Sequence, residues 1–84
     1  MINPSRKAKL IWHCRRGMLE LDLILNRFAN NHLDNITEEQ IEQFDKLLTC
    51  IDPELYSWLM GYEQPTDKDL VEIVEFIKLH DKVR

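Results

Sequence analysis

Apolar residues recur along this chain at intervals of three and four, the spacing that is typical of amphipathic helices. Start and stop signals divide the pattern into five segments. Their apolar stripes are Leu10, Ile11 and Cys14; Leu21, Ile24, Leu25 and Phe28; Ile41, Phe44, Leu47, Leu48 and Ile51; Leu55, Trp58 and Leu59; and Leu70, Ile73, Val74 and Ile77. Two glycines and three prolines in 84 residues favour helices over turn-rich β structure. We therefore predict an all-α fold, a compact single-domain bundle of about five short helices over residues 1–84.

The first two helices are expected on either side of a glycine. The first begins near Pro4 or Ser5, because proline is tolerated at the first helical position. Gly17 would cost about 1 kcal/mol inside a helix. It therefore marks a break, after which the second helix runs from about Met18 to Asn30.

Cap signals place the remaining three helices. The Thr-Glu-Glu-Gln run at residues 37–40 is a capping box that opens the third helix. In the pair Asp52–Pro53, an N-cap is followed by proline at the first position of a short fourth helix, which stops at Gly61. Thr66 and Asp69 are expected to open the fifth helix.

Charge is distributed unevenly along the chain. The net charge of −4 combines six basic residues against two acids up to Phe28 with thirteen acids against five bases from Ala29 onward. A molecule with a basic end and an acidic body can orient toward a partner of complementary sign. A solvated surface with a chance imbalance explains the same pattern equally well.

Several classes of protein lack their signals in this sequence. No apolar run approaches the ~20 residues that a membrane-spanning helix needs. Residues 1–4 do not begin a secretory signal, so we expect a protein of the bacterial cytoplasm. The two serines, Ser5 and Ser57, lack a nucleophile-elbow context, and two isolated glycines cannot form a phosphate loop. We expect no enzymatic activity.

Metal binding and thiol chemistry are also not expected. His13, His32 and His80 are scattered without a metal-binding spacing, and the two cysteines, Cys14 and Cys50, have no nearby partner pair for zinc. Arginines beside Cys14 could activate its thiol, but Cys14 shares the apolar stripe of the first helix. We therefore predict reduced core thiols and a buried, inert Cys14.

The segment Arg16-Gly17-Met18-Leu19-Glu20 is the most informative part of the sequence. Arg16 and Glu20 would lie near one face if the helix continued across Gly17, and an exposed ion pair there is worth well under about 1 kcal/mol. Glu20 also suits the positive end of a helix, and Gly17 can simply cap one. Local structure thus explains these residues as well as function does.

The same segment resembles a known family. Arg16-Gly17-x-x-Glu20 matches the RGxxE signature of the succinate dehydrogenase flavinylation factors, the SdhE family. Further matches are Leu21-Asp22, Phe28, Phe44-x-x-Leu47-Leu48, Asp52-x-x-Leu55-x-x-Trp58-Leu59-x-Gly61 and Pro65-x-Asp67. RGxxE alone is a weak pattern, but with the second block at the right distance it is specific. The resemblance covers almost the whole chain.

The resemblance implies an assembly factor, or chaperone, that binds the flavoprotein subunit of succinate dehydrogenase and promotes covalent FAD attachment. Fumarate reductase flavoprotein subunits are also implied clients. In such clients a histidine bonds to the flavin 8α-methyl group largely through the client's own chemistry. By position, Arg16, Gly17 and Glu20 would bind the client, with Asp22 a weaker addition. The factor itself would bind no cofactor tightly, no metal, no nucleic acid and no membrane, and would supply no catalytic residue.

Three other readings compete with this one. Members of the family have also been described as toxin-neutralising antitoxin-type (CptB-like) binding proteins. Nucleic-acid binding would use the basic residues near the N-terminus, but an isoelectric point of about 5.3 and the lack of a recognisable motif disfavour it. Direct FAD carriage would need a phosphate loop or a deep pocket. Trp12 could belong to the core or to an interface.

Overall fold

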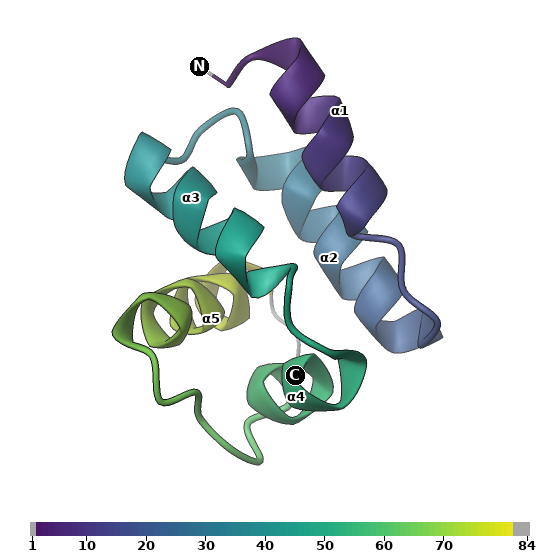
Figure 1. The fold of residues 1–84 in the computed structure, drawn as a ribbon, viewed down its shortest axis with the longest axis vertical. Helices are drawn as coiled ribbons and strands as arrows, with labels where there is room; N and C mark the ends of the chain where they lie inside the picture. The colour runs from purple at the N-terminus through teal and green to yellow at the C-terminus, as the bar shows by residue number, and fades with distance from the viewer. Residues whose placement is uncertain (1, 82–84) are drawn as a thin grey trace.

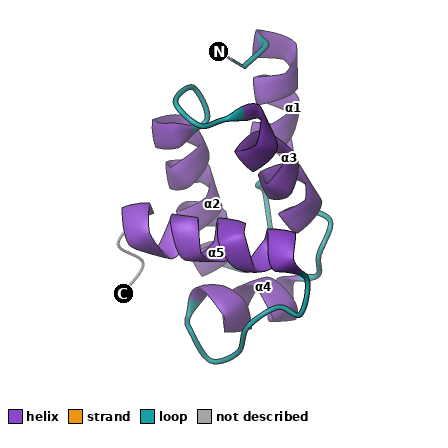
Figure 2. Ribbon diagram, turned by 90° about the vertical axis from the view of Figure 1, so that its left-hand side faces the viewer, coloured by secondary structure: helices purple, strands orange, loops and turns teal. Residues whose placement is uncertain are grey.

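Five α-helices account for most of residues 2–81, the part of the chain that the computed structural model describes. They are α1 (Pro4–His13), α2 (Leu19–His32), α3 (Glu38–Leu47), α4 (Asp52–Leu59) and α5 (Lys68–Asp81). Figure 1 shows α1 and α2 leading into α3, with α4 at the far end of the molecule. Helix α5 packs against α2, α3 and α4, and Figure 2 shows it lying across the molecule, in front of α2 and between α3 above and α4 below. The predicted all-α bundle is confirmed.

The core forms where α2, α3 and α5 meet. The ring of Phe28 on α2 lies 5.3 Å from that of Phe44 on α3 and 5.9 Å from that of Phe76 on α5, measured between centroids. Nearly all predicted stripe residues are buried around these rings; they are Leu10, Cys14, Leu21, Ile24, Leu25, Phe28, Ile41, Phe44, Leu47, Leu48, Leu55, Trp58, Leu59, Leu70, Ile73, Val74 and Ile77. The apolar spacing therefore identified the core.

Ile51 is the one stripe residue that the structure places in solvent, with 62% of its surface exposed. The prediction failed because α3 ends at Leu47, four residues earlier. Ile51 instead has the extended backbone of an N-cap, with φ −80° and ψ 155°, and precedes α4. The helical spacing no longer applies there.

The helix ends follow the cap signals in part. The capping box is confirmed, because the amide of Gln40 donates to Thr37 Oγ1 at 3.1 Å and the amide of Thr37 donates to Gln40 Oε1 at 2.9 Å. Gly61, with φ +84°, lies just beyond the end of α4, as expected. Helix α2 runs two residues past the predicted end, to His32.

Two predicted start residues are wrong. Asp52 is not the N-cap of α4 but its first residue, so Pro53 occupies the second position. At the start of α5, Asp67 caps the helix in place of Thr66: its Oδ1 accepts from the amides of Asp69 at 2.8 Å and Leu70 at 3.4 Å.

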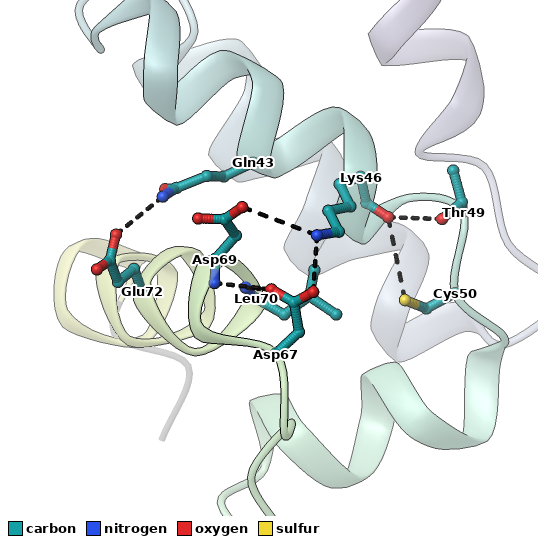
Figure 3. Close-up of polar contacts among 8 residues, drawn as sticks. All are labelled: Gln43, Lys46, Thr49, Cys50, Asp67, Asp69, Leu70 and Glu72. Carbon is teal, nitrogen blue, oxygen red and sulfur yellow. Dashed lines mark hydrogen bonds and ion pairs between the residues drawn. The ribbon is translucent and has the colours of Figure 1, made fainter.

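Polar contacts join α3 to α5 outside the core (Figure 3). The ammonium of Lys46 lies 2.7 Å from Asp67 Oδ2 and 3.7 Å from Asp69 Oδ2. The side-chain Nε2 of Gln43 donates to Glu72 Oε1 at 2.9 Å. The pKa of the Asp67 carboxyl is lowered, first by its hydrogen bond from Lys46 and then by the backbone amides that it caps. Figure 3 shows Lys46 between the two aspartates.

None of the helices in the described range is long and apolar enough to cross a membrane.

Candidate functional site

The signature segment forms the connection between α1 and α2. Helix α1 ends at His13 and α2 begins at Leu19, so the predicted break around Gly17 is confirmed. Because the backbone is not helical between them, Arg16 and Glu20 do not share a helix face. The ion pair of Arg16 is formed with Asp52, at the start of α4.

Arg16 ties this connection to the one between α3 and α4. Its Nη2 donates to the carbonyl of Leu48 at 2.6 Å, and its Nη1 donates to the carbonyl of Cys50 at 3.3 Å and lies 3.5 Å from Asp52 Oδ1. Leu48 is the C-cap of α3, where carbonyls lack helical partners. Only 12% of the Arg16 side chain is exposed. Its guanidinium fork is therefore largely occupied within the chain.

Gly17 is exposed, and the fold does not require a glycine there. A Cβ at this position would meet only Asp52 Oδ2, at the ordinary contact distance of 4.0 Å. Its φ lies outside the left-handed region, which among the described glycines only Gly61 occupies. The absence of a side chain leaves the exposed backbone of Gly17 uncovered beside Asp52, and we call this position the notch.

Glu20 and Asp22 differ in how far they are engaged. Glu20 lies in the first turn of α2, is exposed, and makes no hydrogen bond or ion pair with any described residue. Asp22 is half-buried, and its Oδ1 accepts a hydrogen bond from Asn26 Nδ2 at 3.0 Å. Only the Glu20 carboxylate is available to a partner without losing an internal bond.

Exposed leucines flank Glu20 on the same face of α2. Leu19 is 68% and Leu23 55% exposed, and the two lie one turn apart. Apolar side chains left in water beside an available carboxylate are typical of a surface that a partner covers.

A shallow depression lies beside the signature, at the end of α1. It has a volume of about 510 Å³ and is lined by Trp12, His13, Arg15, Arg16 and Leu48. Trp12 is 65% exposed and is therefore not a core residue, and the Arg15 guanidinium lies 5.2 Å from the centroid of its ring. Sequence reasoning missed this feature. The available signal was that Trp12 falls off the apolar stripe of its helix.

Burial makes the thiols of both cysteines weaker acids than a free cysteine. Cys14 is fully buried, and burial raises the pKa of its thiol to about 12, as its predicted inertness requires. Cys50 is only partly buried, so it is less of a core residue than predicted; burial also raises its pKa. No group of three potential metal ligands is found among the residues that the structure describes.

Comparisons with known proteins point to one family. The family model described as "Flavinator of succinate dehydrogenase" matches residues 8–81, which include the signature. The FAD assembly factor SdhE of Legionella pneumophila (strain Lens) is 58% identical over 77 residues, which cover 92% of this chain and 96% of that protein. The FAD assembly factor SdhE of Idiomarina loihiensis is 43% identical, with 92% and 86% coverage.

A solved structure agrees with these matches. The solution structure of a UPF0350 protein superimposes with a TM-score of 0.80 at 36% identity, covering 98% of this chain and 87% of that one.

Proposed function

The chain belongs to the family of flavinators of succinate dehydrogenase, and from this premise we propose that it is an FAD assembly factor that binds the flavoprotein subunit of that enzyme and promotes covalent FAD attachment. The family match over residues 8–81 is the observation that carries the proposal. The names of the relatives support this reading over the antitoxin-type alternative. The flavoprotein subunit of fumarate reductase is a second proposed client, and the bacterial cytoplasm is the expected location.

The client contacts the open part of the signature. The notch at Gly17 lets a partner's backbone approach closely, and the Glu20 carboxylate offers a charged acceptor to a donor on the client. The signature alone implies that Arg16 binds the client, but we assign it a different role. Because its guanidinium already bonds the carbonyls of Leu48 and Cys50, it positions the notch, while Gly17 and Glu20 touch the client.

The contribution to flavinylation is conformational rather than catalytic. Neither Gly17 nor Glu20 lies in an arrangement of acid, base and nucleophile, so the bond to FAD forms through the client's own groups. Docking favours the client conformation that is competent for attachment. If the factor binds that conformation more tightly by about 3 kcal/mol, the competent state is enriched more than a hundredfold. Tight binding of free FAD is not part of this mechanism.

Gly17→Arg tests the proposal. The variant should fold, because the position is exposed and a Cβ atom there would meet nothing closer than 4.0 Å. It should no longer support FAD attachment, because a long cationic side chain fills the notch. The measurement is the flavin fluorescence that stays with the denatured client subunit after co-expression, compared with circular dichroism of the factor itself.

Gly17→Ala is the matched control, since a single methyl group obstructs the notch far less. We expect it to retain more activity than the arginine variant. Undiminished covalent flavin with a folded Gly17→Arg protein would contradict the proposal. Repeating the assay with the fumarate reductase subunit tests the second client.

A further inference from the structure

The depression beside the signature combines an aromatic face, an aliphatic wall and positive charge. Trp12 and Leu48 provide the apolar surfaces, and His13, Arg15 and Arg16 are the remaining lining residues. No acidic side chain lines it. In a chain with a net charge of −4, this is a locally basic surface on an acidic molecule.

Arg15 is one of the exposed basic residues of the described chain whose charge no ion pair neutralises. Arg6 pairs with Glu38, Lys7 with Asp34, Lys46 with Asp67, and Arg16 with Asp52. The contact that the structure gives Arg15 is the ring of Trp12, and Arg15 forms no ion pair with a described residue.

The contact with Trp12 leaves the N–H groups of Arg15 available. The cation–π contact uses the charge of the guanidinium and none of its N–H donors, and the Arg15 side chain makes no hydrogen bond with a described residue. These groups form a fork that matches a carboxylate, and the ring limits the side-chain motion that binding would otherwise have to freeze. The pair is therefore organised in advance for a carboxylate ligand.

We propose that the Trp12–Arg15 depression is a second contact site for the client flavoprotein and takes an acidic segment of it. This inference rests on the proposed function. A carboxylate of the segment binds Arg15, and a neighbouring apolar side chain packs on Trp12 and Leu48. Arg16 lines the depression and adjoins Gly17, so the site is continuous with the notch. The acidic remainder of the chain would repel the same segment, so the site also orients the client.

Charge reversal at Arg15 is the central test. Arg15→Glu should weaken binding of the purified flavoprotein subunit about tenfold or more, because an attraction becomes a repulsion at a packed contact. Lys9→Glu is the matched control: it makes the same charge change at an exposed position of α1 that does not line the depression, and should stay within about twofold. Binding is measured by isothermal titration calorimetry at low and raised salt.

Two further variants separate the parts of the contact. Trp12→Ala should also weaken binding about tenfold, since it removes both the stacking platform and the apolar wall. Arg15→Lys keeps the positive charge but loses the guanidinium fork. Its affinity for the subunit should lie between those of the wild type and Arg15→Glu. Both side chains are exposed, so all variants should keep the wild-type circular dichroism spectrum.

The outcomes distinguish this inference from the proposed function. If the wild type binds the subunit, Gly17→Arg does not, and Arg15→Glu and Trp12→Ala bind like wild type, the second site is refuted and the proposed function stands. If Arg15→Glu and Lys9→Glu weaken binding of the subunit equally, the effect comes from long-range charge, and the second site is also refuted. If Arg15→Glu instead abolishes binding to transfer RNA or to free FAD while the client still binds, the depression serves another ligand. Failure of the wild type to bind the subunit overturns both.

Discussion

Arg16 and Glu20 belong to one signature but have different structural situations. Arg16 is largely covered and bonds the carbonyls of Leu48 and Cys50, whereas Glu20 is exposed and unpaired among the described residues. Substitutions at the two positions should therefore reduce function for different reasons, one through the fold and one through the contact.

Arg16→Lys should lower the free energy of unfolding by about 1–3 kcal/mol, because the two carbonyls bond different nitrogens of the guanidinium fork and a single ammonium nitrogen lacks that spread, which leaves a part-buried acceptor unsatisfied. Glu20→Gln should change it by less than about 0.5 kcal/mol, as expected for an exposed side chain without partners. Urea unfolding measures both values. Both variants should nevertheless impair client flavinylation. Wild-type stability of Arg16→Lys would contradict its positioning role.

Residue-level prediction from sequence succeeded where local spacing decides the outcome. The burial of Cys14 followed from its place on the apolar stripe, and the break at Gly17 followed from helix propensity. The partners of Arg16 did not follow, because Leu48 and Cys50 are 32 and 34 residues away and are contacted through backbone carbonyls. A carbonyl leaves no trace in residue type, so only the folded chain identifies it.

At the scale of elements, the start of α5 depends on one aspartate with two tasks. Asp67 caps the helix through Oδ1 and pairs with Lys46 of α3 through Oδ2, as Figure 3 shows. Sequence reasoning chose Thr66 instead because several capping residues lie within a few positions. The contact with Lys46, on another helix, is what distinguishes Asp67 from its neighbours.

The pH dependence of stability should reveal the contribution of the Asp67 carboxylate. The folded state lowers the pKa of Asp67, so its contribution is present above the unfolded value of about 3.9 and is lost as the pH falls through the folded one. Asp67→Asn should therefore melt below wild type at neutral pH, and the difference should shrink in acid. Thermal melts from neutral pH to about pH 2 measure it.

Asp45→Asn provides the comparison for the Asp67 experiment. Asp45 is exposed and makes no hydrogen bond or ion pair with a described residue. Its substitution should leave the melting temperature close to wild type at every pH. A melting difference for Asp67→Asn that is independent of pH would contradict the charged role of the carboxylate.

At the scale of the whole molecule, one ring connects most of the bundle. Phe28 is fully buried and contacts Phe44 of α3 and Phe76 of α5. Phe28→Ala should cost about 3–5 kcal/mol. A chain of this size has a total stability of about 4–13 kcal/mol. The loss should therefore lower the urea concentration at which all the helices unfold together. Urea unfolding followed by circular dichroism measures it.

Leu23→Ala, on the exposed face of α2, is the control and should change stability by about 0.5 kcal/mol or less. A Phe28→Ala loss as small as that of the control would show that the ring is not central to the core.

The charge asymmetry of the sequence is weaker in the folded molecule than along the chain. Arg6 and Lys7 of the basic N-terminal part pair with Glu38 and Asp34 of the acidic remainder. Counting charges along a sequence cannot reveal such pairing, since the partners are about 30 positions apart. Arg16 of the same part pairs with Asp52, so at least three of its six basic residues have an acidic partner in the folded chain.

The vacancy at Gly17 has a consequence for how this protein fails in a cell. Chaperones and proteases remove chains according to how often they unfold, and a substitution at this position should change that frequency little, because a Cβ atom there meets no close neighbour. A damaging substitution there would escape surveillance and accumulate at normal abundance. A measurement of the amount of this protein would therefore not detect such a mutation. Only the loss of covalent flavin from the client subunit would reveal it.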